Sequence, residues 1–143
     1  MAAAADPSVA CVAALDSRNV GEYGRALRRD RSADSGLVAA NDSLTQPGAP
    51  YRVEAGGAGL VAEMKANAER WDVTAHARVL SGRPILLVSA MFRADKDSLV
   101  AALDRVGARR VTALAWGTDH SFSDRRFALA RVVVGWLRST CAL

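Results

Sequence analysis

Three apolar runs of strand length stand out along the chain. They cover residues 9–15 (VACVAAL), 84–90 (PILLVSA) and 110–116 (RVTALAW). Continuous apolar runs of this length are typical of parallel strands that are buried on both faces. The pattern therefore predicts three parallel strands, near residues 8–15, 84–90 and 110–116.

Apolar positions at helical spacing follow the second and the third run. Residues 97–106 form one predicted helix, with Asp97 or Ser98 as its N-cap and Gly107 as its end. Residues 123–139 form another, and its apolar stripe consists of Phe127, Ala130, Val133, Val134 and Leu137. Strands that alternate with helices in this way predict an α/β fold with a parallel sheet and flanking helices.

The region between the first two strands, residues 17–80, is richer in charge, glycine, serine and proline. Helices are predicted here at residues 23–31, 60–71 and 74–80. Residues 43–59 contain two prolines and four glycines, which is typical of a loop. We therefore expect a helical, cap-like insert within a single domain that spans residues 1–143.

Composition narrows the class of protein. A chain of 143 residues suits one domain, and a hydrophobic content of 50% excludes a disordered chain. A net charge of +4 is weak support for a nucleic-acid partner. The start of the chain has no signal-peptide pattern, and no apolar run approaches the length of a membrane span. The expected location is the cytoplasm.

The two cysteines, Cys11 and Cys141, have neither a disulfide framework nor the spacing of a metal site. They favour a reducing compartment, and Cys11 is predicted to be a buried thiol. His76 is predicted to be a surface histidine, since no partner stands at metal-ligand spacing. The glycines of residues 56–59 do not follow a strand, and no Lys-Ser/Thr pair follows them, so a phosphate-binding loop is excluded.

The segment with the clearest chemical potential is GTDHSFSDRR, residues 117–126. His120 stands just past the carboxyl end of the third predicted strand, and a long helix follows. The carboxyl ends of parallel strands are where α/β folds place their sites. The alternative is a loop histidine that is satisfied by nearby backbone.

Residues 83–137 resemble the last two strands of the α/β-hydrolase fold family. The matching segments are PILLVSA, an acid at Asp95 or Asp97, SLVAALDRVG, RVTALAW and DHSF. The N-terminal AAAADPSVACVAALDSRNVG is similar to the segment that follows the family's nucleophile elbow. The resemblance implies a serine hydrolase of the esterase or peptidase type, with His120 as general base and an aspartate that orients it.

The resemblance leaves two choices for the acid. Asp95 is the predicted residue, because Asp97 also suits the cap of the following helix. Asp119 shares a tight loop with His120 and is poorly placed to hold the distal ring nitrogen.

The serine nucleophile has no counterpart here. The sequence contains no Gly-x-Ser-x-Gly, and Ser89 lacks the small neighbours that a tight elbow needs. By the resemblance, the nucleophile lies before Met1, so the expectation is a partial α/β-hydrolase domain that is inactive alone. Without upstream strands, the first strand becomes an exposed edge, and we expect self-association.

The expected activity is hydrolysis of a small-molecule ester or peptide, with no cofactor, no metal, no nucleic-acid partner and no membrane contact. The alternative is a non-catalytic remnant of the fold that serves as an interaction module. An upstream Gly-x-Ser-x-Gly in the same reading frame would support the hydrolase, and its absence would support the non-catalytic remnant.

Overall fold

A computed structural model describes residues 2–32, 34–42, 55–90 and 94–141, without the side chains of residues 2, 40, 41 and 94–97. The chain divides into two compact units. The sheet unit comprises residues 1–18 and 73–143, and the helical unit comprises residues 19–72. Of the predicted insert 17–80, residues 17, 18 and 73–80 thus belong to the sheet unit.

Three parallel strands form the sheet, in the order β1 (Val12–Leu15), β2 (Ile85–Ser89) and β3 (Val111–Ala115). Val12 is in register with Ile85, and Ile85 with Val111. The predicted mixed α/β architecture with a three-stranded parallel sheet is confirmed, although each strand is shorter than its apolar run.

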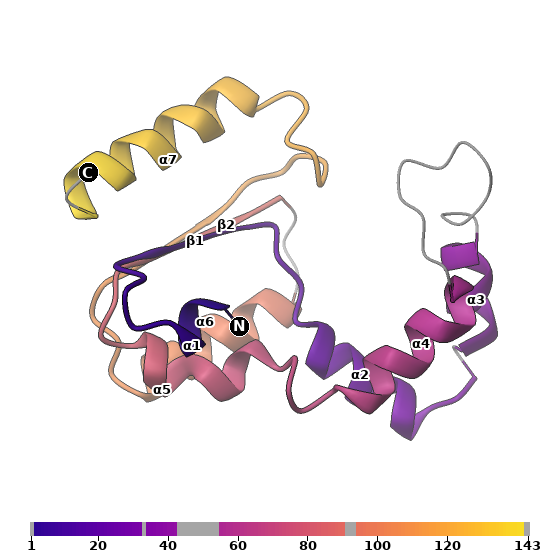
Figure 1. Cartoon of the computed structure of the whole chain (residues 1–143). Coiled ribbons are helices and arrows are strands. Elements are labelled where there is room, and N and C mark those ends of the chain that lie inside the picture. The colour runs from indigo at the N-terminus through magenta and orange to yellow at the C-terminus, as the bar shows by residue number, and fades with distance from the viewer. Residues whose placement is uncertain (1, 33, 43–54, 91–93, 142–143) are drawn as a thin grey trace. The chain divides into compact units, whose positions relative to one another are not determined.

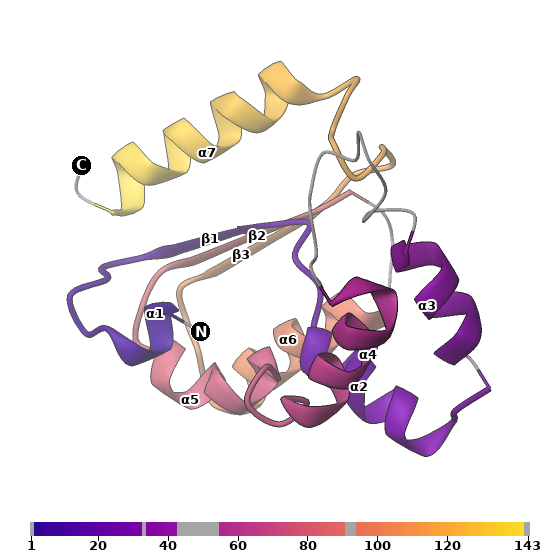
Figure 2. The ribbon, with the colours of Figure 1, turned by 45° about the vertical axis from the view of Figure 1, so that its right-hand side comes forward.

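Helices cover both faces of this sheet (Figures 1 and 2). The helix α7 (Arg126–Thr140) lies on one face, and α1 (Ala2–Ala5), α5 (Ala77–Leu80) and α6 (Ala94–Arg105) lie on the other. A short 3-10 helix, η2 (Val73–His76), leads into α5. Side chains of β2 alternate between the two layers, because successive residues of a strand point to opposite faces. Ile85 and Leu87 pack with α5 and α6, whereas Leu86 and Val88 pack with α7.

The two outer strands are less buried than β2. The run Ile85–Val88 is buried throughout, but β1 and β3 have exposed positions. Leu15 keeps 41% of its surface exposed. In the described chain β1 pairs with β2 alone, so the apolar run around it forms an edge strand.

The helix α6 ends where the sequence predicts. Gly107 has a φ of 76°, in the left-handed region that glycine adopts without a steric penalty. Its N–H donates to the Asp104 carbonyl over 2.8 Å, and the Ala108 N–H donates to the Leu103 carbonyl over 3.0 Å. This pair of bonds closes the helix as a Schellman motif. The start differs, because α6 begins at Ala94 rather than at a cap on Asp97 or Ser98.

The prediction of free cysteines is wrong. Cys11 and Cys141 form a disulfide, with Cα atoms 5.9 Å apart and 130 residues of separation along the chain. Cys11 directly precedes β1 and Cys141 caps the end of α7. Packing of α7 against the sheet therefore brings together two thiols that the sequence places at opposite ends.

The helical unit packs α2 (Val20–Arg29), α3 (Asp34–Asp42) and α4 (Gly56–Ala66) around a small core. Its buried members are Leu27, Val61 and Met64. Most of the predicted loop 43–59 lies outside the described residues, but its end is wrong, since Gly56 to Gly59 begin α4. A Cβ on Gly57 would stand 2.2 Å from the Val38 carbonyl oxygen, so the glycine permits close approach of α3.

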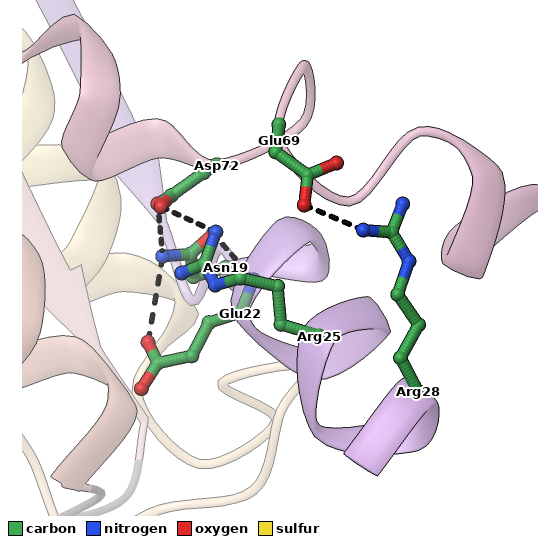
Figure 3. A network of polar contacts seen from close by, with 6 residues as sticks. All are labelled: Asn19, Glu22, Arg25, Arg28, Glu69 and Asp72. Atoms are coloured by element: carbon green, nitrogen blue, oxygen red, sulfur yellow. Dashed lines mark hydrogen bonds and ion pairs between the residues drawn. The ribbon is translucent and has the colours of Figure 1, made fainter.

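Polar side chains join the two ends of the helical unit (Figure 3). Asn19 Nδ2 donates to Asp72 Oδ1 over 2.8 Å, and Arg25 Nη1 lies 2.7 Å from Asp72 Oδ2. Nearby, Arg28 Nη1 lies 2.5 Å from Glu69 Oε1. The Asp72 carboxylate thus has a permanent cation on one oxygen and an amide on the other.

None of the helices in the described ranges has both the length and the apolar character that crossing a bilayer requires.

Candidate active site

The candidate site lies at the carboxyl edge of the sheet, where the chain leaves β1 and β3. The first residue after β1 is Asp16, and the loop between β3 and α7 carries His120. Because the strands are parallel, the residues that follow them meet at one edge.

Asp16 is a buried carboxylate, with only 6% of its surface exposed. Its backbone has a φ of 44°, a left-handed conformation that is uncommon for residues other than glycine and is tolerated best by asparagine and aspartate. Its N–H donates to the Val88 carbonyl over 2.7 Å, and its Oδ1 accepts the Ala90 N–H over 2.9 Å. Backbone groups of β2 and of the residue after it therefore fix both the main chain and the carboxylate of Asp16.

The second carboxylate oxygen, Asp16 Oδ2, contacts Nδ1 of His120. An ionised carboxylate only accepts hydrogen bonds, so this contact requires the ring proton on Nδ1. The His120 side chain is 75% exposed, and its Nε2 makes no hydrogen bond to any described residue. In the neutral ring Nε2 then carries a lone pair that is open to solvent.

Aromatic packing anchors the loop that carries His120. Phe122 is buried and meets Trp116 edge to face, with ring centroids 6.0 Å apart. Its φ of 51° turns the chain, and its N–H donates to the Asp119 carbonyl over 2.9 Å. The Thr118 N–H donates to the Ala90 carbonyl over 3.0 Å. The loop is therefore tied to the same residue, Ala90, that holds the Asp16 carboxylate.

Two exposed carboxylates stabilise the ends of this loop. The backbone N–H of Ser123, followed by its hydroxyl, lowers the pKa of Asp119 below its ordinary value. The hydroxyl of Thr118 donates to Asp124 and is the main cause of a lowered pKa there. Asp119 and Asp124 therefore accept hydrogen bonds from within the loop. The carboxylate that contacts the His120 imidazole is that of Asp16.

The predicted site residues have different outcomes. His120 lies in the predicted loop and has a carboxylate partner. The side chains of Asp95 and Asp97 lie outside the described residues, so neither choice of acid is tested. Asp16 was missed by sequence reasoning, although a signal was present, because it directly follows an apolar run predicted to be a strand.

The other histidine, His76, is not the surface residue that the sequence predicts. It is half-buried in η2, and its Nε2 is a buried atom without a hydrogen-bond partner among the described residues. In the part of the chain that is described, no group of three metal-ligating side chains comes together.

The arrangement matches what general-base chemistry needs. A carboxylate holds Nδ1, orients the ring and stabilises its protonated form, while Nε2 faces outward to take a proton. Comparison of the chain with models of protein families, with curated proteins and with solved structures gives no match.

Proposed function

We propose that Asp16 and His120 form the acid–base pair of a hydrolase of the α/β-hydrolase type, which cleaves ester or peptide bonds. His120 is the general base and Asp16 orients it. The single observation that carries this proposal is the contact of Asp16 Oδ2 with His120 Nδ1, which leaves Nε2 open to solvent.

The fold supports the same proposal. A parallel sheet carries the two residues on loops that follow its outer strands, with the central strand between them. The resemblance of residues 83–137 to the α/β-hydrolase family supplies the reaction class, and it assigns His120 the same role. A serine nucleophile is not part of the proposal for this chain, since the sequence has no Gly-x-Ser-x-Gly.

Hydrolysis of p-nitrophenyl acetate tests whether the Nε2 lone pair of His120 is accessible and reactive, because an imidazole can attack this activated ester as a nucleophile without a serine. The Nε2 lone pair forms a bond to the acetyl carbon, p-nitrophenolate leaves, and water then hydrolyses the acyl-imidazole. We expect the chain to hydrolyse the ester, and we expect His120→Ala to remove most of this activity. His76→Ala is the matched control, since the sequence has only two histidines. Equal activity of wild type and His120→Ala would refute the proposal.

A fluorophosphonate probe tests the position of the nucleophile. We expect no serine of this chain to be labelled, as judged by mass spectrometry. Labelling of one serine that is lost in His120→Ala would place the nucleophile within this sequence.

A further inference from the structure

The disulfide and the Asp16–His120 pair lie at opposite ends of the same two elements. Cys11 precedes β1 and Asp16 follows it. The helix α7 starts after the His120 loop, runs back along the sheet and ends at Cys141 (Figures 1 and 2). The disulfide therefore ties the amino end of β1 to the end of α7, and the Asp16–His120 contact joins the carboxyl end of β1 to the loop that leads into α7.

Apart from these two contacts, β1 is held in the sheet by few backbone hydrogen bonds. It has four residues, and in the described chain β2 is its single neighbour in the sheet. In a parallel pair, only alternate residues of an edge strand bond to the neighbour, and the others point outward. The position of Asp16 thus depends on the row of hydrogen bonds to β2, on the Ala90 N–H that its Oδ1 accepts and, through the strand, on the covalent bond at Cys11.

We propose that reduction of the Cys11–Cys141 disulfide loosens β1 and the end of α7 and so weakens the Asp16–His120 contact, which places the pair under redox control. Its consequence for ester hydrolysis rests on the function proposed above. Both cysteines are half-buried rather than enclosed, which leaves a path for a reductant.

The chemical step is thiol–disulfide exchange with a dithiol. A thiolate of the dithiol attacks one sulfur, which forms a mixed disulfide and releases the other cysteine as a thiolate. The second thiol of the reductant then closes its own disulfide. Two electrons pass to the protein, and Cys11 and Cys141 are left as thiols after they take up the two protons that the dithiol gives up, one when it ionises to the attacking thiolate and one when it closes its disulfide.

The test compares the intact chain before and after treatment with dithiothreitol. Nitrogen-15 NMR of the two imidazoles reports which ring nitrogen carries the proton. We expect the Nδ1-protonated form of His120 to lose population on reduction, while the His76 signals stay unchanged. Hydrolysis of p-nitrophenyl acetate that depends on His120 should fall several-fold.

A variant without the disulfide separates this effect from other actions of dithiothreitol. The double variant Cys11→Ser, Cys141→Ser should resemble the reduced chain and should not respond to the reagent. Unchanged His120 signals in the reduced wild type would overturn the proposal. Loss of the whole fold on reduction, seen as loss of tryptophan fluorescence and circular dichroism, would also overturn it, since the effect would then not be local.

The two proposals fail in different ways. If His120 signals respond to reduction but no hydrolysis depends on His120, the redox coupling stands and the catalytic function fails. If hydrolysis depends on His120 but neither readout responds to dithiothreitol, the redox coupling fails alone.

Discussion

Each unit of the chain contains a buried aspartate, and the two have different partners. Asp72 in the helical unit is 8% exposed and is held by Arg25 and Asn19, as Figure 3 shows. Asp16 in the sheet unit is buried to a similar degree, but the side chain that its Oδ2 contacts is His120, which is charged only when protonated. One carboxylate has a permanent counter-charge and the other has a titratable one.

The difference indicates two kinds of role. A buried carboxylate needs compensation by charge and hydrogen bonds, and an arginine provides it at every physiological pH. A histidine provides this compensation in a form that can gain or lose a proton, which acid–base catalysis requires. We infer that Asp72 stabilises the helical unit, whereas Asp16 positions a reactive group.

The largest expected effect is on stability, from Asp72→Ala. The change removes the 2.8 Å acceptor of the buried Asn19 amide, which keeps a longer contact of 3.4 Å with Glu22 Oε2, and it removes the counter-charge of Arg25, which is itself partly exposed. We expect a loss of about 3 kcal/mol in the free energy of unfolding. This value is at the lower end of the range for breaking a buried ion pair, because Arg25 is partly exposed. Urea denaturation measures it.

Glu69→Ala is the control for that variant. Glu69 pairs with Arg28 in the same network, but its side chain is exposed, so its loss should lower the stability far less than the loss of Asp72 does. Ester hydrolysis by the sheet unit should be the same in both variants. A similar loss of stability for Glu69→Ala would remove the distinction between the buried and the exposed pair.

A smaller effect on stability but a clear one on chemistry is expected from Asp16→Asn. The amide oxygen can still accept the Ala90 N–H, so the fold should persist. The amide NH₂ would then face His120 Nδ1, and because it donates, the ring proton must move to Nε2. Nε2 can no longer act as a base, so hydrolysis that depends on His120 should fall several-fold.

Nitrogen-15 NMR checks this shift of the proton. If the His120 ring remains protonated at Nδ1 in Asp16→Asn, or if hydrolysis is unaffected, then Asp16 does not orient the base. In that case the two buried aspartates would not differ in role.

The sheet unit was predictable because its signals are local. Three apolar runs predict the strands, and Gly107 predicts the end of α6. The position of His120 after the last strand also follows from the sequence. The identity of its partner, Asp16, does not follow from the sequence. Asp16 and His120 are 104 residues apart, and only the parallel pairing of the strands brings them together.

The helical unit was harder to predict. The glycines of residues 56–59 are predicted to lie in a loop, but they lie in the first turn of α4. There they allow two backbones to approach closely, as Gly57 does against the Val38 carbonyl. The disulfide was missed for a related reason, since Cys11 and Cys141 meet only through the packing of α7 on the sheet. Local signals are present in the sequence itself, whereas contacts between residues far apart along the chain exist only in the folded protein.

The sheet unit also exposes a strand edge, and this should affect association. Open edges with apolar side chains pair with other chains. We expect the wild-type chain to self-associate, and Leu15→Lys to shift it toward the monomer, as measured by size-exclusion chromatography with light scattering. Tyr23→Lys is the matched control, since Leu15 and Tyr23 are both 41% exposed and Tyr23 lies on the helical unit. A monodisperse wild-type monomer would exclude association through this edge.

The smallest effect is expected at acid pH, in the loop that carries His120. The pKa values of Asp119 and Asp124 are lowered from 3.8, so folding favours their charged forms. Their contribution to stability is present above a pH of about 4 and is lost as the pH falls through the lowered values. Thr118→Val removes the main donor to Asp124, so the pKa of this carboxyl should rise toward 3.8.

Carbon-13 NMR of the aspartate carboxyls measures that rise. Ser32→Ala is the control in the helical unit, where the Ser32 hydroxyl is the main cause of a lowered pKa at Asp30. It should raise the pKa of Asp30 and leave Asp124 unchanged. If the pKa of Asp124 is the same in the wild type and in Thr118→Val, the hydrogen bond from the Thr118 hydroxyl does not stabilise the loop. The anchoring of His120 would then depend on Phe122 and on the Thr118 N–H alone.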